Sequence, residues 1–150
     1  MTMTTEEIDA FLSEPRLCHF ATIDADGHPR VRPLWFLWSD GVLWLTTRTD
    51  ARHTGRDLRS NPDAAVSIAS EERPYRAVVF HGSPEVTQRD PDRLLAIAAR
   101  YGDQSGRRWL ASALKEPDRV LLKLVPREVL SWDYSRERTD GSKRTSLTRG

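Results

Sequence analysis

The chain has 150 residues, about the size of one domain. Hydrophobic residues make up 38% and charged residues 30%, and five Trp are present, which together exclude an intrinsically disordered chain. Lys and Arg (23) balance Asp and Glu (22), which argues against a protein that binds nucleic acid through excess base. Cys18 is the only cysteine, and no apolar run approaches the roughly 20 residues of a membrane span. We expect a cytoplasmic single domain without nucleic-acid or membrane partners.

Charge separates the C-terminal end from the rest of the chain. Residues 135–150 contain five basic and two acidic side chains and only one large apolar residue, Leu147. Such a segment has little to bury. We expect a domain over residues 1–134 and a basic, flexible tail over 135–150. For this tail, we favour a role in solubility over a role in binding an anion.

The first part of the chain predicts a helix and three strands. Thr4 and Glu7 have capping-box spacing, and Pro15 ends a helix expected over about 5–13. Strands are expected over 17–23, 30–38 and 42–47. Short turns containing Asp-Gly join them, which indicates an antiparallel meander.

The second part alternates short helices with strands. A polar, Arg-rich segment at 51–60 predicts a short helix, and strands are expected over 64–70 and 75–87, the latter with a possible bulge at Gly82. Helices over about 90–101 and 107–114 precede strands at 120–125 and 128–133. The fold class is mainly β (α+β): a small antiparallel barrel of about seven strands with short helices on its rim.

Common catalytic motifs are missing from the sequence. The four histidines, at 19, 28, 53 and 81, form no HxxxH or HExxH pair, and no metal site is expected. The GxSxG, P-loop and GxGxxG motifs are also missing. Cys18 is interpreted as a core residue rather than a nucleophile. An enzymatic activity would therefore depend on a bound cofactor.

Two stretches are more informative than generic barrel sequence. The segment from Arg30 to Trp38 is apolar on both faces after Pro33, which fits a strand that meets the core on one side and a partner subunit or flat ligand on the other. A doubly covered central strand fits the pattern equally well. Further along, Thr46 and Thr47 precede Arg52 and Arg56, and hydroxyls followed by arginines at a helix start suit the binding of an anion. A solvent-exposed, Arg-rich helix without a ligand is the more common explanation of such a segment, and we favour it on the pattern alone.

Together, these stretches resemble one family. The order FATIDADGHPRVRPLWFLWSDGVLWLTT…RDLRSNPDAAVSI…YRAVVFHGSPEV is similar to the split β-barrel flavoproteins of the pyridoxamine 5'-phosphate oxidase-like superfamily, most of all to the actinobacterial branch that uses the deazaflavin F-420. The similarity covers about residues 8–133. It implies an antiparallel six- to seven-stranded split barrel of the FMN-binding type. It also implies a homodimer with cofactor clefts between the subunits, and hydride transfer at the cofactor ring.

The resemblance also assigns cofactor-binding positions. Thr46, Thr47, Arg52 and Arg56, with Arg30 or Arg32, fall where the family holds phosphate, and Trp35, Phe36 and Leu37 fall along the ring. Family members often have Lys four residues before the helix Leu. Here that position is Thr54, for which His53 or Arg52 is a partial replacement.

Three functions follow as hypotheses. The first is an F-420- or FMN-dependent oxidoreductase that reduces a small conjugated substrate, with F-420 ahead of FMN. The second is a non-catalytic protein that stores or senses FMN, F-420 or haem. The third is a silent dimer whose Arg-rich helix or tail binds a partner. Tyr75, Tyr101 and His81 are candidate proton donors, and the loops at 70–73 and 103–106 are expected to select a substrate that the sequence does not identify.

Overall fold

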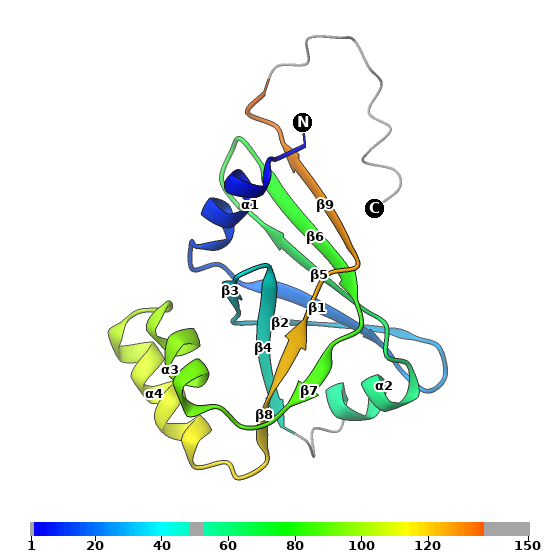
Figure 1. Ribbon diagram of the computed structural model, residues 1–150, viewed down its shortest axis with the longest axis vertical. Coiled ribbons are helices and arrows are strands. Elements are labelled where there is room, and N and C mark those ends of the chain that lie inside the picture. The colour runs from blue at the N-terminus through cyan, green and yellow to red at the C-terminus, as the bar shows by residue number, and fades with distance from the viewer. Residues whose placement is uncertain (1, 49–52, 137–150) are drawn as a thin grey trace.

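The computed structural model describes residues 2–48 and 53–136 (Figure 1). In this part of the chain, two antiparallel sheets carry four short helices. The elements are, in order, α1 (Thr5–Leu12), β1 (Cys18–Ile23), β2 (Pro29–Leu34), β3 (Leu37–Ser39), β4 (Val42–Arg48), α2 (Thr54–Ser60), β5 (Ala64–Ala69), β6 (Arg76–Gly82), β7 (Glu85–Thr87), α3 (Pro91–Ala99), α4 (Asp103–Leu114), β8 (Arg119–Leu124) and β9 (Glu128–Asp133). The predicted fold class, an antiparallel split barrel with short helices on its rim, is confirmed.

The strands divide into a five-stranded sheet of order β2-β1-β5-β6-β9 and a four-stranded sheet of order β3-β4-β8-β7. The chain crosses from one sheet to the other between β2 and β3, between β4 and β5 through α2, between β6 and β7, and between β8 and β9. Two expected long strands, 30–38 and 75–87, are therefore each divided. The prediction of a continuous meander is wrong, and the nine strands found exceed the six or seven expected, because a strand must bend out of one sheet to enter the other.

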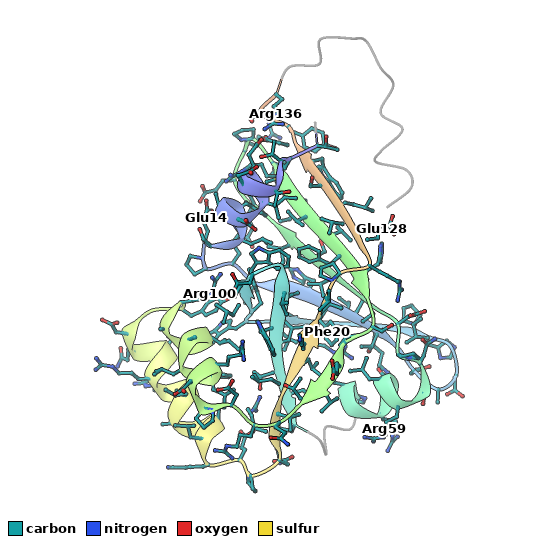
Figure 2. The ribbon with its side chains drawn as sticks, in the orientation of Figure 1. Glu14, Phe20, Arg59, Arg100, Glu128 and Arg136 are labelled. Carbon is teal, nitrogen blue, oxygen red and sulfur yellow. The ribbon has the colours of Figure 1, made fainter. Side chains whose placement is uncertain are left out.

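The space between the sheets is the main core. Phe20, Phe36 and Phe80 are fully buried there, and Figure 2 shows Phe20 in the middle of the molecule. A second buried cluster lies where the α3–α4 pair covers the outside of the four-stranded sheet, and it includes Trp44 and Ile97. Both clusters follow from the alternation of side chains along the strands. The barrel interior is therefore packed, which leaves ligand sites only at its rim and outer faces.

Local signals at the chain's turns and caps have mixed outcomes. The Thr4–Glu7 capping box is present at the start of α1. Asp40 and Gly41 both have positive φ (52° and 75°) and join β3 to β4 as the predicted two-residue turn. The expected bulge at Gly82 is wrong, because Gly82 pairs with Ala64 in unbroken register. The reason for glycine is space: a Cβ there would lie 2.6 Å from Cδ1 of Leu124.

Residues at the end of α3 connect the helices to the barrel. The Arg100 guanidinium donates hydrogen bonds to the carbonyls of Leu12 (3.0 Å), the last residue of α1, and Glu14 (2.9 Å), two residues further on (Figure 2). The next residue, Tyr101, reaches the crossover between β2 and β3. One turn of chain thereby fixes both the N-terminal segment and the crossover.

Candidate functional site

A depression of about 270 Å³ lies between the end of β2, the middle of β4 and helix α4. Two predicted cofactor-binding residues, Trp35 and Thr46, are among the residues that line it: Leu17, Pro33, Leu34, Trp35, Thr46, Trp109 and Arg119. Its surface is mainly apolar and aromatic, with one hydroxyl and one guanidinium. Such a composition suits a planar ring that carries a few polar groups.

Trp35 forms the aromatic wall of this depression because it sits at the crossover between the sheets. Its ring stacks on Tyr101, with centroids 4.4 Å apart and planes 3° from parallel, and Trp109 lies tilted at 5.5 Å. The Tyr101 hydroxyl accepts a hydrogen bond from the Phe36 backbone N–H (3.0 Å) and donates one to the Arg16 carbonyl (2.8 Å). Burial raises the pKa of Tyr101, which keeps this hydroxyl protonated. Tyr101 thus holds Trp35 in a fixed orientation.

The polar side of the depression comes from facing strands. Thr46 Oγ1 donates a hydrogen bond to the Val120 carbonyl (2.9 Å) and accepts one from Arg119 Nη1 (3.4 Å). Arg119 is held by Glu116 through Nε (2.9 Å) and Nη2 (2.6 Å). The sequence predictions did not include Arg119, because only the pairing of β4 with β8 brings it beside Thr46. Thr47, the next residue on β4, is half-buried.

The residues that follow Trp35 in the sequence pack within the protein. Phe36 is fully buried in the main core, and Leu37 packs with Trp44 in the second cluster. Trp38 stacks on Phe80 at 5.0 Å. These contacts lie within one chain, which agrees with the alternative of a strand covered on both faces. Of the three residues expected along a cofactor ring, Trp35 is the one whose side chain lines the depression.

Arg30 and Arg32, expected to hold phosphate, are brought together around a buried carboxylate. Asp57 of α2 is 1% exposed and accepts a hydrogen bond from Thr22 Oγ1 (2.7 Å). Arg30 Nε and Arg32 Nη2 each lie 3.6 Å from Asp57 Oδ2. Burial lowers the pKa of Arg32, and the charge of Asp57 opposes that shift. These two arginines thereby fasten α2 to β1 and β2.

A second carboxylate and His53 complete this group. Arg30 Nη2 lies 3.3 Å from Asp24 Oδ2, and its Nη1 lies 3.0 Å from His53 Nδ1. Asp24 Oδ1 also accepts the backbone N–H groups of Asp26 and His28, which lowers the pKa of Asp24 and closes the β1–β2 turn. Asp24, Asp26 and His28 are close enough to share a metal ion, but the hydrogen bonds of the β1–β2 turn already explain why they lie together. Two arginines here meet two carboxylates, so the group carries no excess positive charge.

The remaining predicted phosphate ligands lie on or before α2. Thr54 is buried, whereas Arg56 is exposed and has no ion pair or hydrogen bond with another described residue. Arg52 lies outside the described residues. Whether these side chains hold phosphate stays a prediction.

The candidate proton donors differ in what surrounds them. Tyr101 already uses its hydroxyl to bond the backbone. Tyr75 is exposed, and His81 bonds Glu128 through Nδ1 at 3.1 Å, away from the depression. Cys18 is fully buried, and burial raises its pKa to about 12, so its interpretation as a core residue is confirmed. None of the described helices is long and apolar enough to cross a membrane.

Comparisons with known proteins match this architecture. Residues 4–133 match the family model described as pyridoxamine 5'-phosphate oxidase. Among solved structures, a conserved hypothetical protein from Mycobacterium tuberculosis is similar at 24% identity and a TM-score of 0.73, over 97% of this chain and 96% of that one. An F420 reductase is similar at 28% identity and a TM-score of 0.68, over 81% and 94%.

A haem storage protein from Vibrio cholerae shares the fold at 22% identity and a TM-score of 0.64, over 84% of this chain and 92% of that one. A search of curated proteins gives no match. The family model nevertheless spans nearly all of the described structure. The chain belongs to the pyridoxamine 5'-phosphate oxidase family.

Proposed function

We propose that the protein is a cytoplasmic flavin- or deazaflavin-dependent oxidoreductase that transfers hydride to a small conjugated substrate. F-420 is preferred to FMN because the chain resembles an F420 reductase at 28% identity. The observation that carries the proposal is the depression walled by Trp35 and Trp109, with Thr46 and Arg119 on its polar side. When bound, the cofactor ring would supply the hydride chemistry. The chain's own residues would bind and orient that ring and exclude water from it.

The size of the depression supports a site completed by a second subunit. Its volume of about 270 Å³ is slightly below the roughly 300–1,000 Å³ of small-molecule sites. One chain thus offers part of a cofactor site. This fits the proposal of a homodimer with clefts between subunits.

The outer face of the five-stranded sheet is the surface that best suits such a dimer. Along β1 and β5, the residues that point away from the core include the small side chains of Ala21, Ala65, Ser67 and Ala69, beside the larger His19. Beside them on β2, Val31 is 68% exposed. A flat face of small side chains allows close approach of a second sheet, and stable interfaces bury about 800 Å² per partner. The dimer proposal therefore rests on this face and not on the aromatic segment.

Most of the arginines near the proposed site are already paired with carboxylates, so few positive charges are left to bind a phosphate. Arg30 and Arg32 are balanced by Asp57 and Asp24, and Arg119 is held by Glu116. Arg56 is the exposed member of the predicted set that has no partner among the described residues. We therefore propose Arg56 together with Arg52 as the phosphate ligands.

The second candidate is a protein that holds a cofactor without turning it over. Two observations favour it: Thr54 is a buried hydroxyl where the family often has Lys, and the fold is shared with a haem storage protein. The third hypothesis, a silent dimer that binds a partner through its Arg-rich helix or tail, lacks such an observation.

Titration of the purified protein with F-420, FMN and haem under identical conditions tests these proposals. Tight binding of F-420 or FMN is expected, lost on Trp35→Ala but kept on Leu95→Ala, a change at an exposed position of α3. Reduction of a quinone or nitroaromatic by the loaded protein then separates an oxidoreductase from a storage protein. Retention of none of the three cofactors would contradict both.

A further inference from the structure

A second, polar cavity of about 270 Å³ lies at the opposite end of the five-stranded sheet from α2. It is formed by the segment before β1, the loop between β5 and β6, and the end of β9. Three arginines from two of these segments, Arg16, Arg73 and Arg76, line it together with Ser70, Glu72 and Asp133. The loop over 70–73 is also the one expected from the sequence to select a substrate. The function proposed above does not use this cavity.

Aromatic rings, more than carboxylates, hold these arginines in place. The guanidinium carbons of Arg16 and Arg76 lie 5.0 and 4.9 Å from the ring centre of Phe11, and that of Arg73 lies 5.8 Å from the ring centre of Tyr75. Contacts of this kind fix a guanidinium without occupying its N–H donors. Arg16 Nε is buried and has no hydrogen-bond partner within the described chain. Arg73 likewise has no ion pair with a described residue.

The three nearby carboxylates, Glu14, Glu72 and Asp133, equal the arginines in number, but among the described residues none of them accepts a hydrogen bond from the guanidinium of Arg73 or Arg76. Glu14 is shared, since it pairs with Arg16 and lies 3.9 Å from Arg76 Nη2. Asp133 accepts both the backbone N–H (2.8 Å) and the hydroxyl (2.6 Å) of Ser135 through Oδ1, and Arg136 lies near its other oxygen. Glu72 is exposed. Guanidinium donors of Arg73 and Arg76 therefore stay available toward the cavity.

We propose that this cavity binds a small oxyanion, the carboxylate or phosphate group of a ligand. Guanidinium groups recognise both groups through paired N–H···O bonds. The cavity is polar and of a size that accommodates one such group with a short attached chain. Binding would place the ligand against the loop over 70–76, which joins β5 to β6.

The test is an amide NMR titration of the cofactor-free, full-length protein with inorganic phosphate and, separately, with succinate at constant ionic strength. Saturable shifts of the Ser70 and Arg76 amides are expected with at least one of the two anions. Arg73→Gln, at an exposed position that leaves the core intact, should raise the dissociation constant about fivefold to tenfold, because it removes a charge-assisted contact on the partly hydrated rim. Arg76→Gln should do the same.

Arg59→Gln is the matched control, since Arg59 is exposed on α2 at the other end of the molecule (Figure 2). Its dissociation constant should stay within twofold of the wild type. Linear, unsaturable shifts with both anions would overturn the proposal, as would equal binding by Arg73→Gln and the wild type. Because no cofactor is present, this result is independent of the titration that tests the proposed oxidoreductase.

Discussion

Replacing Asp57 by Asn should destabilise the fold although it preserves the shape of the side chain. The amide oxygen can still accept the Thr22 hydrogen bond, but the negative charge 3.6 Å from Arg30 and from Arg32 is lost. Breaking a fully buried pair costs roughly 3–5 kcal/mol. The two guanidiniums are 41% and 19% exposed and can turn toward water, which reduces the expected loss to about 2 kcal/mol.

Urea unfolding at pH 7 measures this loss. With an m-value of about 2 kcal/mol/M, the midpoint should fall by about 1 M at unchanged m. Asp63→Asn is the matched control, because Asp63 is 59% exposed and its partner Arg127 is equally exposed. It should change the free energy of unfolding by less than about 0.5 kcal/mol. An Asp57→Asn variant as stable as that control would refute the assignment of Arg30 and Arg32 to fastening α2.

The same variant separates two roles for the arginines. If Arg30 and Arg32 also contact the cofactor phosphate, removing the competing carboxylate should tighten cofactor binding even as stability falls. If they only fasten α2, cofactor affinity should stay the same or weaken. Combining Asp57→Asn with Arg32→Gln should cost less than the sum of the two single changes, by roughly 0.5–3 kcal/mol, since the residues share one interaction.

Three other perturbations have defined outcomes. Tyr101→Phe should keep the ring stacked on Trp35 but leave the Phe36 backbone N–H without its hydrogen-bond acceptor. Urea unfolding should show a free energy of unfolding lower by about 1–3 kcal/mol, while the near-UV circular dichroism of Trp35 persists. Gly106→Ala should destabilise the α3–α4 pair by about 1–3 kcal/mol, because its Cβ would lie 2.3 Å from the Ala98 carbonyl oxygen; Ser105→Ala, at an exposed neighbour, should not. Cys18, with a pKa of about 12 when folded, should resist thiol reagents at pH 8 in native protein. Its unfolded thiol ionises first as pH rises from about 9, so its contribution to stability is complete below that pH and is lost toward pH 12, a slope that Cys18→Ala should remove.

Local physics made much of the fold readable from the sequence. The capping box at Thr4 and Glu7, the Asp40–Gly41 turn and the stop at Pro15 act within a few residues, and the structure has helix and strand ends close to where these signals put them. The resemblance to a family of split barrels supplied the overall architecture, which periodicity alone left as a small barrel with helices on its rim.

Only the tertiary structure decided which side chains share a site. An apolar run such as 30–38 has the same alternation whether it continues straight or bends between two sheets, so its division at Trp35 and Phe36 was invisible in the pattern. The family resemblance placed Arg30 or Arg32 near a phosphate, and only the packing of α2 shows that the buried Asp57 lies beside both guanidiniums. Arg119 lines the depression because β8 pairs with β4, which places it beside Thr46, more than 70 residues away in the sequence. Spacing along the chain reports contacts within one element, whereas these sites are built by long-range strand pairing and by the burial of one charge against another.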